Sequence, residues 1–311
     1  MVPIPDGPAT ALDQLYLTLR LHPLEDPEEF RKFYRSQVNK VRGPDTVARM
    51  SLKLQQAYKA VPFRAFLMGH GGVGKSTEIT RLLENVREQH VGVRLSIATE
   101  LNPASFKVFD VLLLMLARLA EEADRLKAIP LEGVLSEHLV RDIIQWFGSE
   151  QVKTSGTGTV GGGVEVGAGM KWTALLGFFA HAKGELKYAA ERKTETVQYR
   201  LQRLPDLVDL CNRLIDVCSK TLLAKTEKEW ILVVEDLDKA VISPQQLREL
   251  FVQYGTVFQN LRVNLIFTIP VWLAYSPEAN QLPLEFERYM IHDTPVYDRA
   301  HGPHKNGRAA V

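Results

Sequence analysis

The sequence has little of what marks secreted or membrane-spanning proteins. Its 311 residues include only two cysteines, Cys211 and Cys218, seven positions apart on one face of an expected helix. That separation is too long for a disulfide bond, and two cysteines are too few for a zinc site. No stretch approaches about 18 consecutive apolar residues, and the N-terminus lacks a basic segment followed by an apolar core. We therefore expect a protein of the reducing cytoplasm that neither spans a membrane nor is secreted.

The sequence also lacks an excess of either charge. It has 38 lysine and arginine residues against 37 acidic residues, which gives a formal net charge of +1. This balance provides no electrostatic reason to expect nucleic acid as a partner. A basic run at 31–42 contains two aromatic residues, as a nucleic-acid patch would. Acidic residues at 26, 28 and 29 precede it, however, and favour a solvated helix face.

A short apolar run that breaks into a glycine-rich turn lies at Phe63–Thr77. It matches the pattern Gly-x-x-x-x-Gly-Lys-Ser/Thr of the phosphate-binding loop. Residues 65–68 before the turn are typical of a buried strand, and the amphipathic segment 76–89 after it is typical of a helix. Because the motif requires this strand and helix around it, we expect a site for the phosphates of a nucleoside triphosphate.

The residue types in this loop suit phosphate binding. Backbone N–H groups at a helix N-terminus can surround phosphates where no bulky side chains intervene. We expect Lys75 to bridge the β- and γ-phosphates, Ser76 to coordinate Mg²⁺ and Thr77 to contact the outer phosphates. The residues expected to contact nucleotide are Gly69, Gly71, Gly72, Val73, Gly74, Lys75, Ser76 and Thr77.

An apolar strand that ends in acidic residues is expected at Trp230–Asp238. Four consecutive apolar residues at 231–234 are typical of a parallel strand that is buried on both faces. Glu235 and Asp236 then follow at its carboxyl end, where open α/β sheets bind ligands. We expect Glu235 to take part in Mg²⁺ coordination and Asp236 to be the catalytic base that polarises the attacking water.

A further buried strand with a polar residue near its end is expected at Arg262–Pro270. One interpretation makes Thr268 a catalytic residue that hydrogen-bonds the γ-phosphate or the attacking water. The other makes it a β-branched strand residue that only packs. The sequence leaves both open.

The rest of the pattern divides the chain into five parts. Residues 1–61 are a helical N-terminal lead-in, with helices expected at 11–21, 27–34 and 46–59. Residues 62–149 and 196–300 are the two parts of a nucleotide-binding core, 150–195 an insertion and 301–311 a mobile tail. Within the core, further strands are expected at 91–98 and 290–297, and helices at 105–127, 135–147, 197–225 and 244–258.

The segment 150–195 is expected to project from the core. Its first part, 155–171, is rich in glycine and keeps a period of two among its apolar residues, which favours a hairpin or a flexible loop. An apolar stretch follows at 172–182 that is too short to span a bilayer. Contact of this stretch with a membrane or a partner is one hypothesis, and an ordinary surface elaboration is the other.

Together, these motifs resemble a known group of proteins. The order of phosphate loop, acidic strand and strand with a polar residue is similar to the additional-strand branch of the P-loop NTPases. Within that branch, the chain resembles AAA+-like ATPases of the STAND, KAP and origin-recognition groups. The resemblance is carried by 63–80 and 230–239, and more weakly by 262–275. It implies an α/β fold, with a parallel five-stranded sheet in the order 5-1-4-3-2 flanked by helices.

The chain departs from the usual pattern of these families at three points. Glu235 stands where they usually carry aspartate, and Asp236 is shorter than their usual glutamate. Such ATPases normally have a helical lid after the last strand, for which this sequence leaves no room, so we expect either that the sequence is a fragment of a longer protein or that a neighbouring chain supplies the lid. An arginine acting across a subunit interface would be one of three candidates: Arg248, Arg262 and Arg288.

The resemblance implies an ATP-binding protein that hydrolyses ATP with Mg²⁺ and acts as a switch or an oligomerising ATPase. Its expected partners are ATP and ADP, together with copies of itself or another protein. The alternatives are a nucleotide-regulated scaffold, a membrane- or partner-binding module with little turnover, and a P-loop phosphotransferase.

Overall fold

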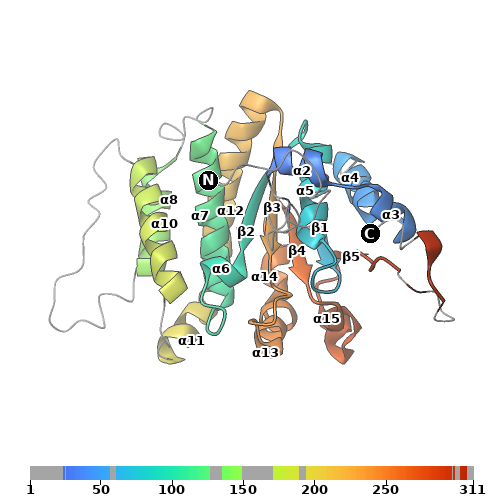
Figure 1. Cartoon of the computed structure of the whole chain (residues 1–311). Helices are drawn as coiled ribbons and strands as arrows, with labels where there is room; N and C mark the ends of the chain where they lie inside the picture. The colour runs from blue at the N-terminus through green and yellow to red at the C-terminus, as the bar shows by residue number, and fades with distance from the viewer. Residues whose placement is uncertain are drawn as a thin grey trace, which may run out of the picture.

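A parallel sheet organises the chain (Figure 1), and the computed structural model describes residues 24, 26–56, 61–126, 135–148, 171–188, 194–295, 297 and 302–306. Within these residues the sheet has five strands: β1 (Arg64–Met68), β2 (His90–Ser96), β3 (Glu229–Glu235), β4 (Asn264–Ile269) and β5 (Glu287–Met290). Their order is β2-β3-β4-β1-β5, and each neighbouring pair is parallel. Read from the β5 edge, this is 5-1-4-3-2, with β1 between β5 and β4 as the resemblance implied.

Helices cover both faces of this sheet. The described helices before β3 are α2 (Pro27–Phe33), α3 (Gln37–Val41), α4 (Thr46–Gln56), α5 (Lys75–Val86), α6 (Ile97–Glu100), α7 (Val108–Arg125), α8 (Glu137–Gly148), α10 (Lys171–Tyr188), α11 (Thr194–Gln202) and α12 (Leu204–Thr226). After β3 come α13 (Pro244–Arg248), a π-helical turn (Glu249–Gln253), α14 (Gly255–Gln259), α15 (Val271–Tyr275) and a 3-10 turn (Pro277–Gln281). The expected helix at 11–21 and most of the tail lie outside the described residues.

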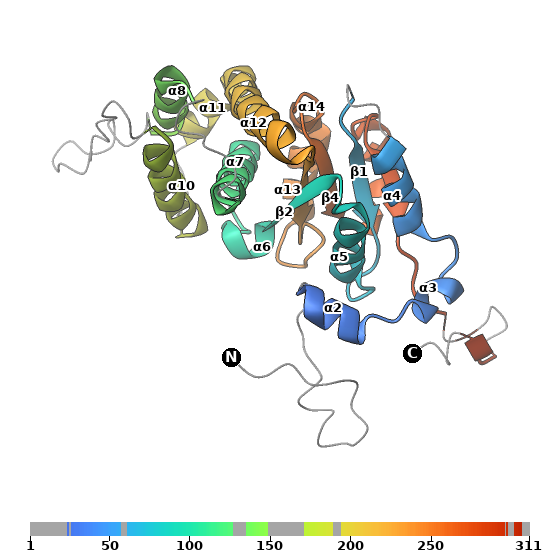
Figure 2. The ribbon, with the colours of Figure 1, turned by 90° about the horizontal axis from the view of Figure 1, so that it is seen from above.

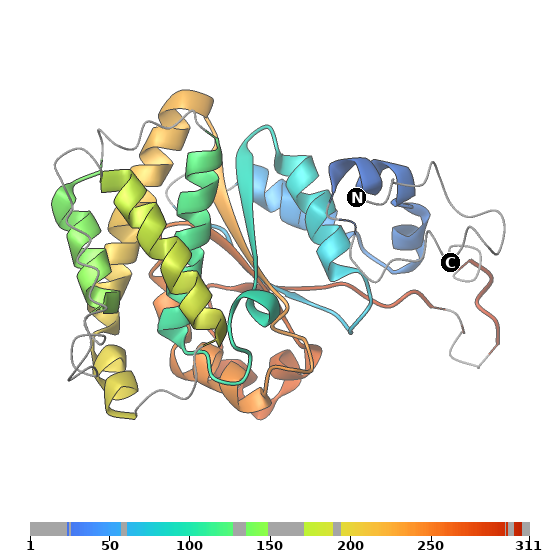
Figure 3. The same cartoon turned by 60° about the vertical axis from the view of Figure 1, so that its left-hand side comes forward.

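The two faces of the sheet have separate cores because strand side chains alternate in direction. Phe66 and Leu232 belong to the core that includes residues of α7 and α12, whereas Leu67 and Val233 belong to the core that includes residues of α4 and α5. Figure 2 shows the sheet between these helices, with α8 and α10 forming a further layer outside α7 and α12. Figure 3 shows α2 and α3 beside α5. The helix that follows the glycine-rich loop is therefore packed on both sides.

The prediction that 150–195 projects from the core is wrong for α10. Trp172, Leu175 and Phe179 are buried in the same core as α7, and α10 packs on both α7 and α8. The apolar face that suggested a membrane or partner contact is covered by the protein itself. Within the part of the chain that the structure describes, no helix combines the length and apolar character needed to cross a membrane. The glycine-rich part, 155–170, lies outside the described residues.

Three predicted element boundaries are also wrong. The last strand ends at Met290 instead of 297. Ile291 N–H still donates to Met68 O at 2.9 Å, but Met68 is the last residue of β1, which then turns away into the loop. Strand β2 ends at Ser96, whose hydroxyl caps α6 by accepting from Thr99 N–H. The expected helix 244–258 is interrupted by the π-helical turn, after which Gly255 lies so close to Pro283 that a Cβ would be 2.6 Å from its ring.

Candidate functional site

The loop between β1 and α5 adopts a conformation that its glycines permit. Gly74 caps α5 with a φ of 96°, in the left-handed region that side chains disfavour. A Cβ on Gly69 would lie 2.8 Å from Val73 Cγ1 and 2.9 Å from Ile291 O, so a larger residue would collide with the segment after β5. The strand, tight loop and twelve-residue helix form the arrangement that the motif predicted.

Lys75 makes three contacts from the first turn of α5. Its Nζ donates to Gly69 O and His70 O, each at 2.8 Å, and lies 2.8 Å from Asp238 Oδ2. The Lys75 side chain is 7% exposed and that of Asp238 is 10% exposed. The ammonium group is thus held at the inner side of the loop by two backbone carbonyls and one carboxylate.

The acidic pair lies at the carboxyl end of β3, as the sequence predicted, and each member has a partner on β2. Arg94 Nε donates to Glu235 Oε1 at 2.6 Å. Ser96 Oγ donates to Asp236 Oδ2 at 2.6 Å, and Lys239 Nζ lies 3.6 Å from Asp236 Oδ1. Asp236 has a φ of 67°, a conformation that aspartate tolerates better than most residues. The strand ends abruptly there, which places the two carboxylates in different surroundings.

Arg94 connects the acidic strand to the glycine-rich loop. Besides Glu235, its guanidinium contacts Thr80 Oγ1 at 3.0 Å and Ser76 O at 3.5 Å. One side chain therefore contacts Glu235 and the backbone carbonyl of Ser76, which links the end of β3 to the start of α5.

A metal site built from protein side chains alone is a separate question. In the described ranges, histidine, cysteine and acidic side chains form no group of three or more suited to hold a metal ion. A Mg²⁺ ion bound jointly with nucleotide phosphates does not need such a group. Ser76 and Glu235 thus fit Mg²⁺ only as part of a nucleotide site.

Thr268 lies on the same face of the sheet as Glu235. Thr268 pairs with Leu67 of β1. Val234 of β3 pairs with Phe267 of β4, so Glu235 and Thr268, the next residue of each strand, lie side by side. Its side chain is 1% exposed, and its hydroxyl has no hydrogen-bond partner among the described residues. A buried hydroxyl without a partner costs free energy, which favours the functional interpretation over simple packing.

Sequence reasoning missed three residues of this site: Arg94, Ser96 and Asp238. Arg94 and Ser96 alternate with buried Val93 and Leu95, so their spacing indicates that they share one face of β2. That the face borders Glu235 depends on β2 lying beside β3, which the strand order supplies. Asp238 lies in the acidic strand motif itself, where its position two residues after Asp236 was the available signal.

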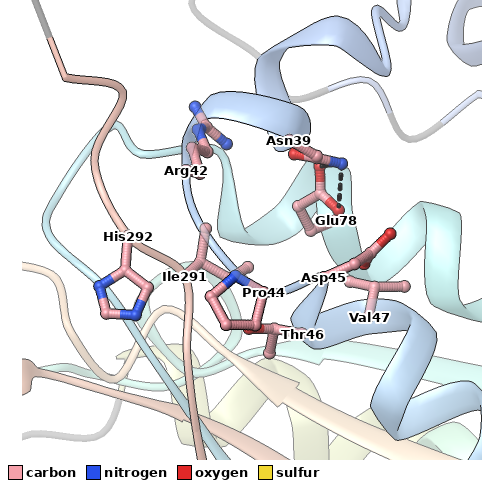
Figure 4. Close-up of a pocket in the computed structure, with 9 residues that line it drawn as sticks. All are labelled: Asn39, Arg42, Pro44, Asp45, Thr46, Val47, Glu78, Ile291 and His292. Carbon is pink, nitrogen blue, oxygen red and sulfur yellow. Dashed lines mark hydrogen bonds between the residues drawn. The ribbon is translucent and has the colours of Figure 1, made fainter. Parts of the chain in front are cut away.

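A pocket lies beside the first turns of α5 (Figure 4). Its lining comes from α3, the start of α4, α5 and the segment after β5: Asn39, Arg42, Pro44, Asp45, Thr46, Val47, Glu78, Ile291 and His292. Thr46 Oγ1 donates to Met290 O at 2.7 Å, and Arg42 Nε donates to Thr294 Oγ1 at 2.9 Å. The N-terminal lead-in is therefore joined to the segment that follows β5.

Polar groups under this pocket fix α5 to the lead-in. Tyr34 donates to Glu78 Oε1 at 2.9 Å, and burial together with the Glu78 carboxylate raises the Tyr34 pKa. Burial alone would raise the Asp45 pKa, but its hydrogen bond with Arg81 and two from backbone N–H groups outweigh this and lower it. Asp45 is therefore held ionised beside Arg81.

The loop also contacts the segment after β5 through its one histidine. His70 Nδ1 lies 2.5 Å from Asp293 Oδ2, and both side chains are exposed. Together with Ile291, this contact joins the glycine-rich loop to the far edge of the pocket.

Comparison with known proteins adds no assignment. No protein-family model matches the sequence, and no curated protein shows significant similarity to it. The class of protein must therefore be argued from the site itself.

Proposed function

We propose that the chain is a Mg²⁺-dependent P-loop NTPase of the additional-strand branch, an ATPase that acts as a nucleotide-controlled switch. The observation that carries the proposal is the contact of Lys75, at the start of α5, with the acidic end of β3. Strand β4 separates β3 from β1, so this contact joins the two halves of the motif across an intervening strand. The orphaned hydroxyl of Thr268 supports the proposal independently.

The position of each residue indicates its role in nucleotide binding. The amides of the loop and Lys75 bind the β- and γ-phosphates, since a helix N-terminus and an ammonium group both attract anions. Ser76 and Glu235 would hold Mg²⁺, which would supply positive charge against the phosphates. The Thr268 hydroxyl donates a hydrogen bond to the γ-phosphate.

Asp236 is the residue placed to orient the attacking water. Its carboxylate is held by Ser96 and has Lys239 nearby, whereas Glu235 is taken up by Arg94. The two acids thus have separate partners, and the Arg94–Glu235 ion pair would have to give way where Glu235 coordinates Mg²⁺. We expect Asp236→Asn to retain nucleotide binding and to slow hydrolysis by several orders of magnitude at most.

We infer a reducing compartment such as the cytoplasm, because Cys211 and Cys218 are free thiols buried in α12. We also infer that copies of the chain or a protein partner complete the site with an arginine. Adenine is preferred on the basis of the resemblance, so ATP and GTP should be compared.

The test is steady-state ATP hydrolysis with Mg²⁺, measured beside Lys75→Ala. Turnover should fall to background in Lys75→Ala with folding retained. A matched control is Lys53→Ala, which removes a lysine that forms an ion pair with Glu287 instead of contacting the loop. Unchanged ATP affinity in Lys75→Ala would refute the phosphate-loop assignment, and tight binding without turnover in the wild type would favour a nucleotide-regulated scaffold.

A further inference from the structure

We propose that Asp238 competes with the phosphates of the nucleotide for Lys75, so that nucleotide binding displaces the turn after β3. This inference rests on the proposed function and adds a residue that sets nucleotide affinity. It starts from the contacts of Lys75, whose Nζ donates hydrogen bonds to Gly69 O and His70 O and forms an ion pair with Asp238 Oδ2 at 2.8 Å. A phosphate that Lys75 binds would take the place of one of these oxygens beside the ammonium group.

Asp238 is the contact that can give way. The two carbonyls belong to the loop backbone, where His70 O also accepts from Val73 N–H at 3.3 Å. Asp238 is instead a side chain with rotatable bonds. It is also an anion, and two anions beside one cation in a partly buried site repel each other.

The neighbouring residues limit how far the turn can move. Leu237 and Ile242 are both buried in the main core and anchor its ends. Between them, Lys239 and Val241 are exposed. Such a movement would break two backbone hydrogen bonds of the turn. They run from Lys239 N–H to Asp236 O and from Ile242 N–H to Lys239 O. Displacement is thus confined to 238–241, next to Asp236.

The first measurement is the affinity for ATP of the wild type and of Asp238→Asn, by calorimetry. If the ion pair holds Lys75 in about nine molecules of ten, removing it should tighten ATP binding about tenfold. AMP lacks the β- and γ-phosphates that Lys75 contacts, so its affinity should not change. Asp206→Asn is the matched control, because Asp206 on α12 pairs with Arg203 at 3.3 Å, outside the site.

The second measurement follows the turn itself. Lys239 is exposed, so trypsin can cut after it, and the rate of that cut can be followed by mass spectrometry. ATP should speed the cut in the wild type. In Asp238→Asn the cut should be fast with or without ATP.

The outcomes separate this inference from the proposed function. If the wild type binds ATP, Lys75→Ala weakens binding and Asp238→Asn does not tighten it, the competition is refuted and the proposed function stands. Weaker binding and lost turnover in Asp238→Asn would instead make Asp238 part of the metal or catalytic machinery. If the wild type does not bind ATP at all, both the proposed function and this inference fail.

Discussion

Replacing Thr268 by valine should stabilise the protein and slow the reaction. The Thr268 hydroxyl is buried and has no hydrogen-bond partner among the described residues. The whole residue is only 1% exposed. Burying a hydroxyl without a hydrogen bond costs about 1–3 kcal/mol, and valine has nearly the same shape. Thr268→Val should therefore raise the free energy of unfolding by about 1 kcal/mol, the low end of that range.

The same change should remove an interaction with the γ-phosphate. A hydrogen bond to a charged group contributes about 1.5–3 kcal/mol, which corresponds to turnover slowed by roughly tenfold to hundredfold. Urea unfolding followed by circular dichroism measures the first effect, and steady-state ATP hydrolysis measures the second. Thr268→Ser keeps the hydroxyl and should retain most of the activity.

A second control separates the orphaned hydroxyl from threonine in general. Thr221 Oγ1 donates to Val217 O at 2.8 Å, so Thr221→Val loses a hydrogen bond and should not stabilise the protein. If Thr268→Val destabilises the protein, the hydroxyl has a structural partner and the reasoning is wrong. If stability rises while turnover is unchanged, Thr268 does not contact the reacting groups.

Three further predictions concern the fold. Phe179→Ala should lower the free energy of unfolding by about 3–5 kcal/mol, because the side chain is fully buried in the core that α10 shares with α7. Urea unfolding measures this change. A loss below about 1 kcal/mol would show that α10 is not part of the core. Burial lowers the His90 pKa, although Glu229 opposes the shift. As the pH falls, His90 is therefore protonated at a higher pH in the unfolded chain than in the folded protein. Stability should be constant above about pH 6.5, the ordinary histidine value, and fall below it. His90→Gln should flatten that fall between pH 7.5 and 5.5, and equal slopes would contradict it. Burial raises the Cys218 pKa to about 12 and raises that of Cys211, so neither thiol should react with a thiol reagent at pH 8 until the protein unfolds.

The parts of the fold that were predictable are those written in local patterns. The apolar run 231–234 identified β3, and the glycines after β1 identified the turn into α5, because both signals lie within a few residues. The placement of α10 was not predictable in this way. Its apolar residues indicate burial without indicating the partner, and its packing on α7 and α8 depends on residues far away in the sequence.

The candidate site divides along the same line. Lys75, Ser76, Glu235 and Asp236 were found from motifs, whereas Arg94 depends on the pairing of β2 with β3. The bounds of β5 depended on pairing too, since Ala65 lies opposite Glu287. Registers between strands are set by the whole sheet, and no local pattern records them.

The position of β1 inside the sheet has a consequence for how the chain is made. Phe63 N–H donates to the side chain of Asn264, 201 residues later, and β5 follows β4. A ribosome that has synthesised the glycine-rich loop must therefore add about two hundred residues before β1 has neighbours, and contacts of such separation form slowly. A nucleotide bound at the proposed site would therefore stabilise only the last stage of folding. Until β4 and β5 have been made, the nascent chain exposes an unpaired apolar strand, which can pair with other chains.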